Sequence, residues 1–304
     1  MRIAVAIGDP NGIGPEIAVK AALKLRGDRI RPLLVGDAFV IRAYAKDAEL
    51  DIADVNALAR SAHAPGTCDP RAGAATVAYV REAVKLCEAG RVDAVVACPQ
   101  SETAINNAGI RFSGYTPLVA DLTNTPREKV FLMLVAAGLR IAHVTLHESV
   151  QHALARMTPE LVINAGIAAA DAARRLGVAR PRIGVFGINP HAGEHGLFGS
   201  EDENVTRPAV AELKRRGLNV DGPVGADLML AQRMHDAYVA MFHDQGHIAV
   251  KLLSPLRSSA LAAGVPLLFS SVGHGCAYDI AGKGVADPGA VEETMKLLAG
   301  AAVN

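Results

Sequence analysis

The chain alternates along its whole length between short runs of branched aliphatic residues and alanine-rich segments with helical periodicity. We interpret the runs at residues 3–7, 32–35 and 94–97 as buried strands. Strands that alternate with helical segments in this way are typical of βα units around a mostly parallel sheet. The pattern therefore predicts an α/β fold.

Helix signals stand between the predicted strands. Pro15 and Glu16 suit the first turn of a helix that runs to about Leu25. Residues 158–160, Thr-Pro-Glu, predict an N-cap followed by a proline at the first helical position, with the helix continuing to Gly177. A further helix ending near Gly90 would carry its apolar face on Val77, Val80, Val84 and Cys87.

Two β-like runs, at residues 130–135 and 140–146, are close enough in sequence to pair as an antiparallel hairpin. The sheet is therefore expected to be mixed. Residues 51–69 are small and polar and predict no regular element. The chain has no internal repeat and no long linker, which favours two closely packed lobes. Further strands are predicted at residues 182–187, 238–242 and 265–271.

Composition and charge exclude several classes of protein. Hydrophobic residues make up 50% of the chain and charged residues 20%, which excludes intrinsic disorder. Lys plus Arg and Asp plus Glu number 31 each, so no net charge attracts nucleic acid or an anionic membrane. The apolar stretch between Lys129 and Arg140 is shorter than the roughly 20 residues of a spanning helix. The N-terminal apolar run is too short for a signal peptide, and we expect a cytoplasmic protein.

The cysteines form no Cys-x-x-Cys pair and no zinc-ribbon spacing. We expect buried thiols in a reducing compartment rather than a disulfide framework. They are Cys68, Cys87, Cys98 and Cys276.

Histidines follow several of the strand-like runs, where an open α/β sheet binds its ligands. They are His147, His191, His243 and His274. Neutral imidazole is a common ligand of divalent metals, and three histidines with an open position describe a catalytic site. The alternative for each of them is a structural histidine whose hydrogen bonds are satisfied within the fold.

The segments around these histidines offer further polar groups. Residues 187–194 and 243–246 contain side chains that could orient a metal ligand. The alternative is a tight turn with local hydrogen bonds. Residues 8–15 lie between a predicted strand and a helix and could face an anion, but they match neither the dinucleotide fingerprint nor a P-loop. Lys251 could hold a substrate carboxylate or relay a proton, or be a solvated surface lysine.

The motifs at residues 8–16, 108–114, 189–194 and 243–246 together resemble those of the 4-hydroxythreonine-4-phosphate dehydrogenase family. They read Gly-Asp-Pro-x-Gly-Ile-Gly-Pro-Glu, Ala-Gly-Ile-x-Phe-Ser-Gly, Asn-Pro-His-Ala-Gly-Glu and His-Asp-Gln-Gly, in family order over almost the whole chain. The resemblance implies an isocitrate/isopropylmalate-dehydrogenase-like fold of two α/β lobes. One lobe would comprise residues 1–117 and 266–304, and the other residues 118–265.

The resemblance also implies a homodimer whose active sites lie in the cleft between the lobes and at the subunit interface. It implies NAD or NADP as cofactor and a divalent metal such as zinc, magnesium or cobalt. The family's metal ligands fall on His147, His191 and His243, and its substrate-binding lysine falls on Lys251. His274 matches a position that is not a ligand.

The chain departs from the family where the family binds phosphate. Tyr115 and Thr116 stand in place of a His-Thr pair, Ala260 in place of an asparagine, and Phe269 in place of an arginine. Glu102 replaces a lysine. Losing an arginine fork and gaining a carboxylate both oppose the binding of a phosphate dianion.

Residues 97–99, 102–105, 112–115 and 144–150 look like the terephthalate cis-dihydrodiol dehydrogenase branch. The expected function is therefore metal-dependent, NAD(P)-linked oxidation and decarboxylation of a cyclic cis-dihydrodiol carboxylate, which would give a catechol. One alternative is a dehydrogenase of 4-hydroxythreonine 4-phosphate or phosphothreonate, in vitamin B6 or related metabolism. A second is a non-redox transferase or sensor on the same fold.

These resemblances imply roles for individual residues. The metal would lower the pKa of the substrate hydroxyl and so favour hydride transfer to the nicotinamide. Lys251 would anchor a carboxylate or deliver a proton, and Asp244 would orient a ligand or relay a proton. Tyr115 and Thr116 would contact substrate. No cofactor-binding residue is predicted.

Overall fold

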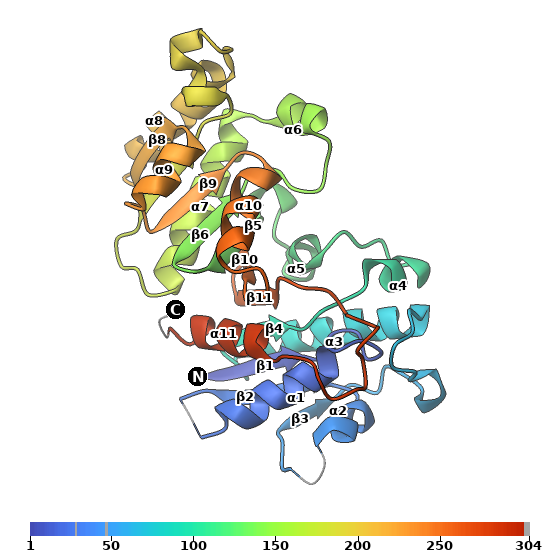
Figure 1. Ribbon diagram of the computed structural model, residues 1–304. Coiled ribbons are helices and arrows are strands. Elements are labelled where there is room, and N and C mark those ends of the chain that lie inside the picture. Colours follow the sequence, from blue (N-terminus) through green and yellow to red (C-terminus); the bar gives the residue numbers. More distant parts are fainter. Residues whose placement is uncertain (28, 46–47, 301–304) are drawn as a thin grey trace. The chain divides into compact units, whose positions relative to one another are not determined.

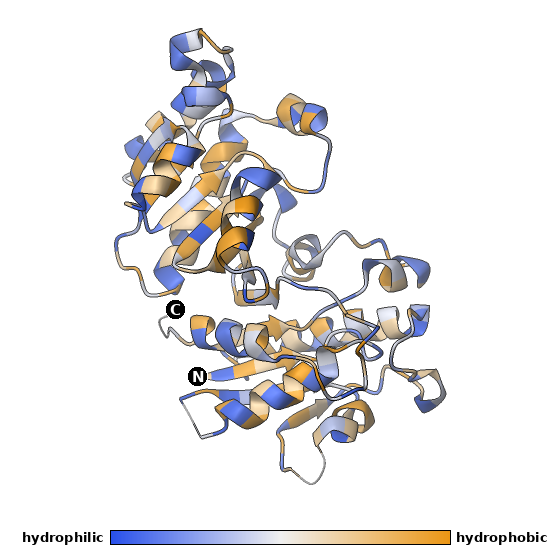
Figure 2. Ribbon diagram, viewed as in Figure 1, coloured by the Kyte–Doolittle hydropathy of each residue, from blue (hydrophilic) through white to orange (hydrophobic). Residues whose placement is uncertain are grey.

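The computed structural model describes residues 1–27, 29–45 and 48–300. The chain divides into two compact units, each with helices packed on a β-sheet (Figure 1). Apolar residues concentrate on the strands and on the inner faces of the helices in both units (Figure 2). Of the helices in the described ranges, none is both long and apolar enough to cross a membrane.

Both units are assembled from separate stretches of the chain. Unit 1 contains Met1–Asn124, Leu256–Ala260 and the chain from Pro266 to the end of the described residues. Unit 2 contains Thr125–Pro255 and Leu261–Val265.

The sheet of unit 1 has the strand order β3-β2-β1-β4-β11, and these strands pair in parallel. Strands β1 and β4 lie inside this sheet and are buried almost completely, because helices cover both faces. This explains their continuous aliphatic sequence. The strand bounds are β1 (Arg2–Ala6), β2 (Arg31–Gly36), β3 (Ile52–Asp54), β4 (Ala94–Ala97) and β11 (Leu268–Val272).

The helices of unit 1 lie on both faces of its sheet. Helix α1 packs against α2 and α11, while α3 packs on β1 and β2 from the opposite face (Figure 1). The Asp69 carboxylate caps α3 by accepting a hydrogen bond from the Arg71 backbone N–H. The bounds are α1 (Gly14–Leu25), α2 (Ala38–Ala45), α3 (Pro70–Glu88), α4 (Glu102–Asn107), α5 (Tyr115–Leu122) and α11 (Gly289–Leu298), with a short 3₁₀ helix η1 (Arg60–Ala62).

The sheet of unit 2 has the order β5-β6-β9-β7-β8 and is mixed. Strands β5 and β6 form an antiparallel hairpin whose two turn residues, Ala137 and Gly138, both have positive φ angles, 49° and 77°. Such a turn matches the right-handed twist of the strands it joins. The bounds are β5 (Phe131–Ala136), β6 (Leu139–His143), β7 (Arg182–Phe186), β8 (Asn219–Val224), β9 (Ala237–Ala240) and, shared with unit 1, β10 (Ser259–Ala263).

Helices α7 and α10 cover opposite faces of this sheet (Figure 1). The Thr158 hydroxyl caps α7 by accepting a hydrogen bond from the Leu161 N–H. The bounds are α6 (Val150–Arg156), α7 (Pro159–Arg175), α8 (Arg207–Arg215), α9 (Ala226–Gln232) and α10 (His243–Leu253), with short helical turns η2 (Arg127–Lys129), η3 (Pro190–Gly196) and η4 (Asp202–Thr206).

The structure confirms the predicted α/β class, the mixed sheet and the hairpin. It also contains strand β3 in the polar stretch at residues 51–69, where no regular element was predicted. The prediction missed this strand because β3 lies at the edge of the sheet, is only half-buried and so carries little apolar pattern. The four cysteines are free. The expectation that all of them are buried is wrong for Cys68, which is exposed, and for Cys87, which is half-buried.

Asp37 is a buried carboxylate that holds the loop after β3 in place. It is 1% exposed and accepts hydrogen bonds from the backbone N–H groups of Ala57 and Leu58, each at 2.7 Å. The Tyr79 hydroxyl donates a third, at 2.8 Å, from helix α3. Three donors therefore converge on one side chain between β2 and α2.

We predict that Asp37→Ala lowers the free energy of unfolding by about 3–5 kcal/mol, because it leaves the Leu58 N–H and the Tyr79 hydroxyl without a partner inside the fold. Tyr79→Phe removes one donor and leaves no unpaired hydroxyl, so it should cost about 1 kcal/mol. Urea unfolding followed by circular dichroism measures both. Equal costs for the two variants would contradict the role given to Asp37.

Candidate functional site

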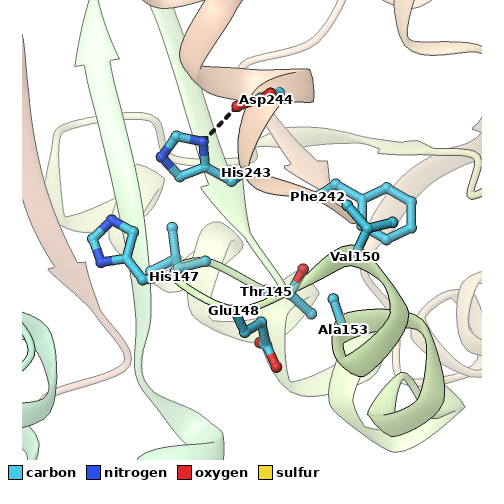
Figure 3. Close-up of a pocket in the computed structure, with 9 residues that line it drawn as sticks. Thr145, His147, Glu148, Val150, Ala153, Phe242, His243 and Asp244 are labelled. Atoms are coloured by element: carbon cyan, nitrogen blue, oxygen red, sulfur yellow. Dashed lines mark hydrogen bonds and ion pairs between the residues drawn. The ribbon is translucent and has the colours of Figure 1, made fainter.

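A pocket in unit 2 lies where the segment after β6 meets the start of α10 (Figure 3). One side of it is polar and the other is apolar: Val150, Ala153 and Phe242 form the apolar side. Val150 is 70% exposed, which is unusual for a large aliphatic side chain. The full lining is Thr145, Leu146, His147, Glu148, Val150, Ala153, Phe242, His243 and Asp244.

Two of the predicted metal ligands come together here. The ring centroids of His147 and His243 are 5.6 Å apart, and both rings extend to the same side of the pocket (Figure 3). The Asp244 carboxylate lies 2.7 Å from Nδ1 of His243. A carboxylate oxygen accepts hydrogen bonds, so Nδ1 of His243 is the donor in this pair and Nε2 is the ring nitrogen left for a ligand bond. This carboxylate–imidazole pair is the arrangement that orients a metal-binding histidine.

Gln245 fixes the start of α10. Its Oε1 accepts hydrogen bonds from the backbone N–H groups of Met241 and Phe242, and its Nε2 donates to the Gly187 carbonyl at 3.0 Å. The first two bonds satisfy donors at the junction of β9 and α10, and the third ties this junction to the end of β7. The glutamine of the His-Asp-Gln-Gly motif therefore positions His243.

Two more histidines stand beside His243. The rings of His243 and His247 stack with centroids 3.6 Å apart and planes 10° apart. The ring of His143, on β6, lies 4.6 Å from that of His247. Burial lowers the pKa of His143 to about 3 and that of His247 to about 4, so both imidazoles are neutral near pH 7.

His191 lies in an unusual turn, η3. Five successive residues, from His191 to His195, have φ angles between 42° and 78°, which makes a short left-handed helix. Left-handed conformation costs a non-glycine residue about 1–2 kcal/mol. The buried Asp202 carboxylate opposes this cost by accepting hydrogen bonds from the N–H groups of Ile188 and Asn189, at 2.8 and 2.9 Å.

The structure thus brings His147 and His243 into one pocket and leaves His191 on a separate turn of the same unit. Within the described ranges, no group of three or more His, Cys, Asp or Glu side chains is arranged to hold a metal ion. The donors themselves suit such an ion, because His243 is a carboxylate-oriented imidazole and His147 is exposed beside it. The ligand set of His147, His191 and His243 stays a prediction.

The other predicted site residues lie elsewhere. Lys251 is in the last turn of α10, and partial burial lowers its pKa. Tyr115 is in unit 1 and 8% exposed, and its hydroxyl donates to the Cys98 carbonyl at 2.8 Å. Its ring packs edge-on against Phe269, which is fully buried. Thr116 follows Tyr115 in α5 and is half-buried.

Unit 1 has a pocket of its own, beside the loop after β11 and the start of α11. Its walls are mostly aliphatic, with the Asp287 carboxylate and the His274 imidazole as polar groups. Gly275 borders open space, since a Cβ placed there would have no atom within 4 Å. The lining is Ile13, Leu256, His274, Gly275, Ala277, Asp287 and Ala290.

Neither His247 nor His143 was among the site residues predicted from the sequence. A signal for His247 is present, because His243 and His247 are four residues apart and so share one face of a helix. His143 lies inside a strand-like run and carries no such signal, since only the packing of α10 on β6 brings it near His247.

The family of the chain follows from comparison with known proteins. The model of the family described as pyridoxal phosphate biosynthetic protein PdxA matches residues 7–298. The chain belongs to this family. The match includes all the predicted metal ligands and both pockets.

Two relatives are especially similar. A 1,2-dihydroxy-3,5-cyclohexadiene-1,4-dicarboxylate dehydrogenase from Comamonas sp is 51% identical, over 98% of this chain and 96% of the relative. The structure of a terephthalate 1,2-cis-dihydrodiol dehydrogenase from Burkholderia xenovorans LB400 is 49% identical, with a TM-score of 0.78 over 98% of this chain and 97% of the other. Both are named as dehydrogenases of a ring diol.

A relative named for a phosphorylated substrate is less similar in sequence. The 4-hydroxythreonine-4-phosphate dehydrogenase structure from Klebsiella pneumoniae is 33% identical, with a TM-score of 0.86 over 98% of each chain. A β-decarboxylating dehydrogenase from Thermococcus kodakarensis, 18% identical with a TM-score of 0.56 over 98% of this chain and 82% of the other, shares the fold. These likenesses confirm the predicted family and its decarboxylating-dehydrogenase-like fold, and they support an oxidoreductase.

We predict that Glu194→Gly leaves the free energy of unfolding unchanged or raises it by up to about 1 kcal/mol. Glu194 is exposed and has φ 42° and ψ 57°, so glycine relieves its left-handed conformation and offsets the greater entropy of the unfolded chain. The matched control is Lys85→Gly, in the right-handed helix α3, which should cost about 1 kcal/mol. Chemical denaturation of both variants tests this, and equal losses would contradict the left-handed turn.

Proposed function

We propose that the protein is a metal-dependent, NAD(P)-linked dehydrogenase that oxidises and decarboxylates a cyclic cis-dihydrodiol carboxylate. The observation that supports this best is the pocket in unit 2, where a carboxylate-oriented imidazole pair faces an apolar wall. A ring diol needs both features, polar groups at its hydroxyls and apolar contact along its carbons. The 51% identity to a dehydrogenase named for such a diol agrees with this assignment.

His147, His191 and His243 are the proposed holders of a divalent metal such as zinc, magnesium or cobalt. When bound, such an ion acts as a Lewis acid that lowers the pKa of a substrate hydroxyl. Asp244 keeps the proton of His243 on Nδ1 and so leaves Nε2 available as a ligand. It is also a candidate to receive the hydroxyl proton.

The apolar wall of Val150, Ala153 and Phe242 is proposed to contact the carbocycle. A bound nicotinamide would supply the oxidant, accepting a hydride from the carbinol C–H as the hydroxyl loses its proton. The resulting ketone lies β to a carboxylate, so carbon dioxide leaves as the C–C electron pair forms an enolate. The enolate then takes up the proton and becomes a catechol. Lys251 is proposed to anchor a carboxylate of the substrate or to deliver this proton, and Tyr115 and Thr116 are proposed substrate contacts.

Phosphorylated hydroxy acids are the alternative substrates, and the surroundings of Phe269 argue against them. This position, where the resemblance expects an arginine, holds a fully buried ring packed on Tyr115. The Tyr115 hydroxyl is already bonded to the Cys98 carbonyl. An arginine at residue 269 would place an unpaired charge among buried rings, which is costly. These positions therefore favour a substrate without phosphate.

The pocket in unit 1 is proposed to take the adenosine part of the nicotinamide cofactor. Its aliphatic walls suit an adenine ring, and the Asp287 carboxylate can accept hydrogen bonds from ribose hydroxyls. NAD and NADP both carry this adenine ring, so the proposal covers either cofactor.

A homodimer is proposed as the assembly. Helix α10 exposes Ile248, Leu252 and Leu253 to solvent, by 56%, 80% and 47%. Exposed apolar side chains grouped on one helix are typical of a subunit contact. The free cysteines agree with a reducing compartment, and we propose the cytoplasm.

The substrate is tested with the purified, zinc-supplemented protein and NAD or NADP. We expect reduced nicotinamide and carbon dioxide to form in equal amounts from terephthalate cis-dihydrodiol, and little product from 4-phosphohydroxythreonine. Absorbance at the reduced-nicotinamide band and trapped carbon dioxide measure both products. Turnover of the phosphate ester alone would overturn the substrate assignment, and no reduction with either substrate would favour a transferase or sensor.

His191→Ala serves as the control variant for this assay. Removing a proposed ligand should abolish metal retention and turnover. Because His191 is exposed, its removal should leave the fold intact. An active variant without metal would contradict the proposed ligand set.

We predict that Gly275→Leu raises the Kd for NAD or NADP at least tenfold without changing the thermal unfolding temperature. The backbone of Gly275 has no positive φ angle and its Cβ direction is open, so leucine fits the fold and fills the pocket of unit 1. Calorimetric titration with each dinucleotide measures the effect. An unchanged Kd would place the cofactor elsewhere.

A further inference from the structure

Helix α10 carries two histidines one turn apart, and their rings lie face to face. The centroids of His243 and His247 are 3.6 Å apart and the planes differ by 10°. Side chains four residues apart on a helix are neighbours, but such flat stacking requires both rings to hold a fixed orientation. The stack is therefore an ordered feature of α10.

His247 is held more firmly than His243. Its Nδ1 lies 3.1 Å from the His243 carbonyl oxygen, which can only accept, so Nδ1 donates and carries the ring proton. The ring of His143 lies beside it, 4.6 Å away between centroids and tilted by 54°. His143 in turn donates from Nδ1 to the Leu132 carbonyl. His247 is thus held by the helix backbone and by contact with a buried ring of β6.

His243, by contrast, has a weak tether of its own. It is the first residue of α10, and its side chain is 34% exposed. The Asp244 carboxylate that it contacts is 78% exposed. A pair with that much solvent access selects the nitrogen that carries the proton but adds little to the stability of one ring plane. The flat face of His247 is the nearer ring contact of His243, with centroids 3.6 Å apart against 5.6 Å for His147.

The two stacked imidazoles are not arranged to ligate one ion together. A metal lies in the ring plane of each imidazole that binds it, about 2.0–2.1 Å from nitrogen for zinc. Two nearly parallel rings with centroids 3.6 Å apart direct their ring nitrogens side by side instead of toward one point. The role of His247 must therefore be exerted through His243.

We propose that His247 is a positioning residue of the metal site, which holds the ring plane of His243 by stacking so that its Nε2 faces the ion. The proposal rests on the proposed function, since it assumes that His243 is a metal ligand. It assigns to His247 no contact with substrate or metal. What the site requires at residue 247 is a flat ring, and not a nitrogen atom.

Three variants separate these properties. His247→Phe keeps a flat ring and loses both nitrogens, His247→Asn keeps an amide N–H near the position of Nδ1 and loses the ring, and His247→Leu loses both. We expect His247→Phe to bind Zn²⁺ and Co²⁺ within about threefold of the unsubstituted protein. We expect the other two to bind about 10–100-fold more weakly, the range seen when support of a ligand is removed. Competition with a chelator measures these affinities without any turnover.

The Co²⁺ absorption spectrum gives a second readout. At saturating Co²⁺ the ligand-field bands of all three variants should match those of the unsubstituted protein, and kcat should recover, because no ligand is lost. His243→Ala should differ in both respects. The same three substitutions at His63, which lies in unit 1 and packs edge-on against Phe39, are the matched controls and should leave metal affinity unchanged. Circular dichroism verifies that each variant is folded.

Two results would overturn the positioning role while leaving the proposed function intact. One is an affinity that none of the His247 variants changes. The other is a loss in His247→Phe as large as in His247→Leu, with altered Co²⁺ bands, which would make a nitrogen of His247 a ligand itself. If the unsubstituted protein binds neither ion, the proposed metal site fails and the positioning role fails with it.

Discussion

The close approach of α10 to β6 is the constraint on which the unit 2 site depends. Gly246 makes it possible, because a Cβ at this position would lie 2.2 Å from Nε2 of His143, far inside van der Waals contact. Any side chain there would push the helix away from the strand and move His243 and His247 with it. Gln245, one residue earlier, then fixes the start of the helix through hydrogen bonds to the junction after β9 and to the Gly187 carbonyl. The motif His-Asp-Gln-Gly thus combines the proposed ligand His243, its orienting carboxylate, an anchor and a close contact.

Buried carboxylates hold the loops that these sheets present. Asp202 fixes the segment before the left-handed turn in unit 2. In unit 1, Glu16 is 2% exposed and accepts hydrogen bonds from the N–H groups of Gly284 and Ala286, while Lys20 lies 2.7 Å from its carboxylate. A buried carboxylate without such donors would be strongly destabilising, so each one fixes the loop whose N–H groups it requires. Conformations that are costly in themselves, such as that of His191, persist only where the surroundings restrain them in this way.

The two units contribute different chemistry. Unit 2 offers imidazoles and a carboxylate beside an aliphatic and aromatic wall. Unit 1 offers an aliphatic pocket with a carboxylate, and, separately, a cluster of buried rings that includes Tyr115 and Phe269. Rings and a hydroxyl already bonded to the backbone give a phosphate dianion no donor to bind. Relatives of both substrate types share the fold, so the substrate must be decided by side chains such as these.

The sequence by itself determined the features that depend on neighbouring residues. The alternation of strands and helices, the hairpin turn at Ala137 and the Thr158 cap arise from local backbone preferences, and the motifs identified the family. Edge strand β3 was not predicted from the sequence, because its few residues are only half-buried and carry little apolar pattern. Tertiary structure alone decided the left-handed turn at His191 and the insertion of His143 beneath α10. The physical reason is that both depend on contacts between residues far apart in the chain, which no local periodicity encodes.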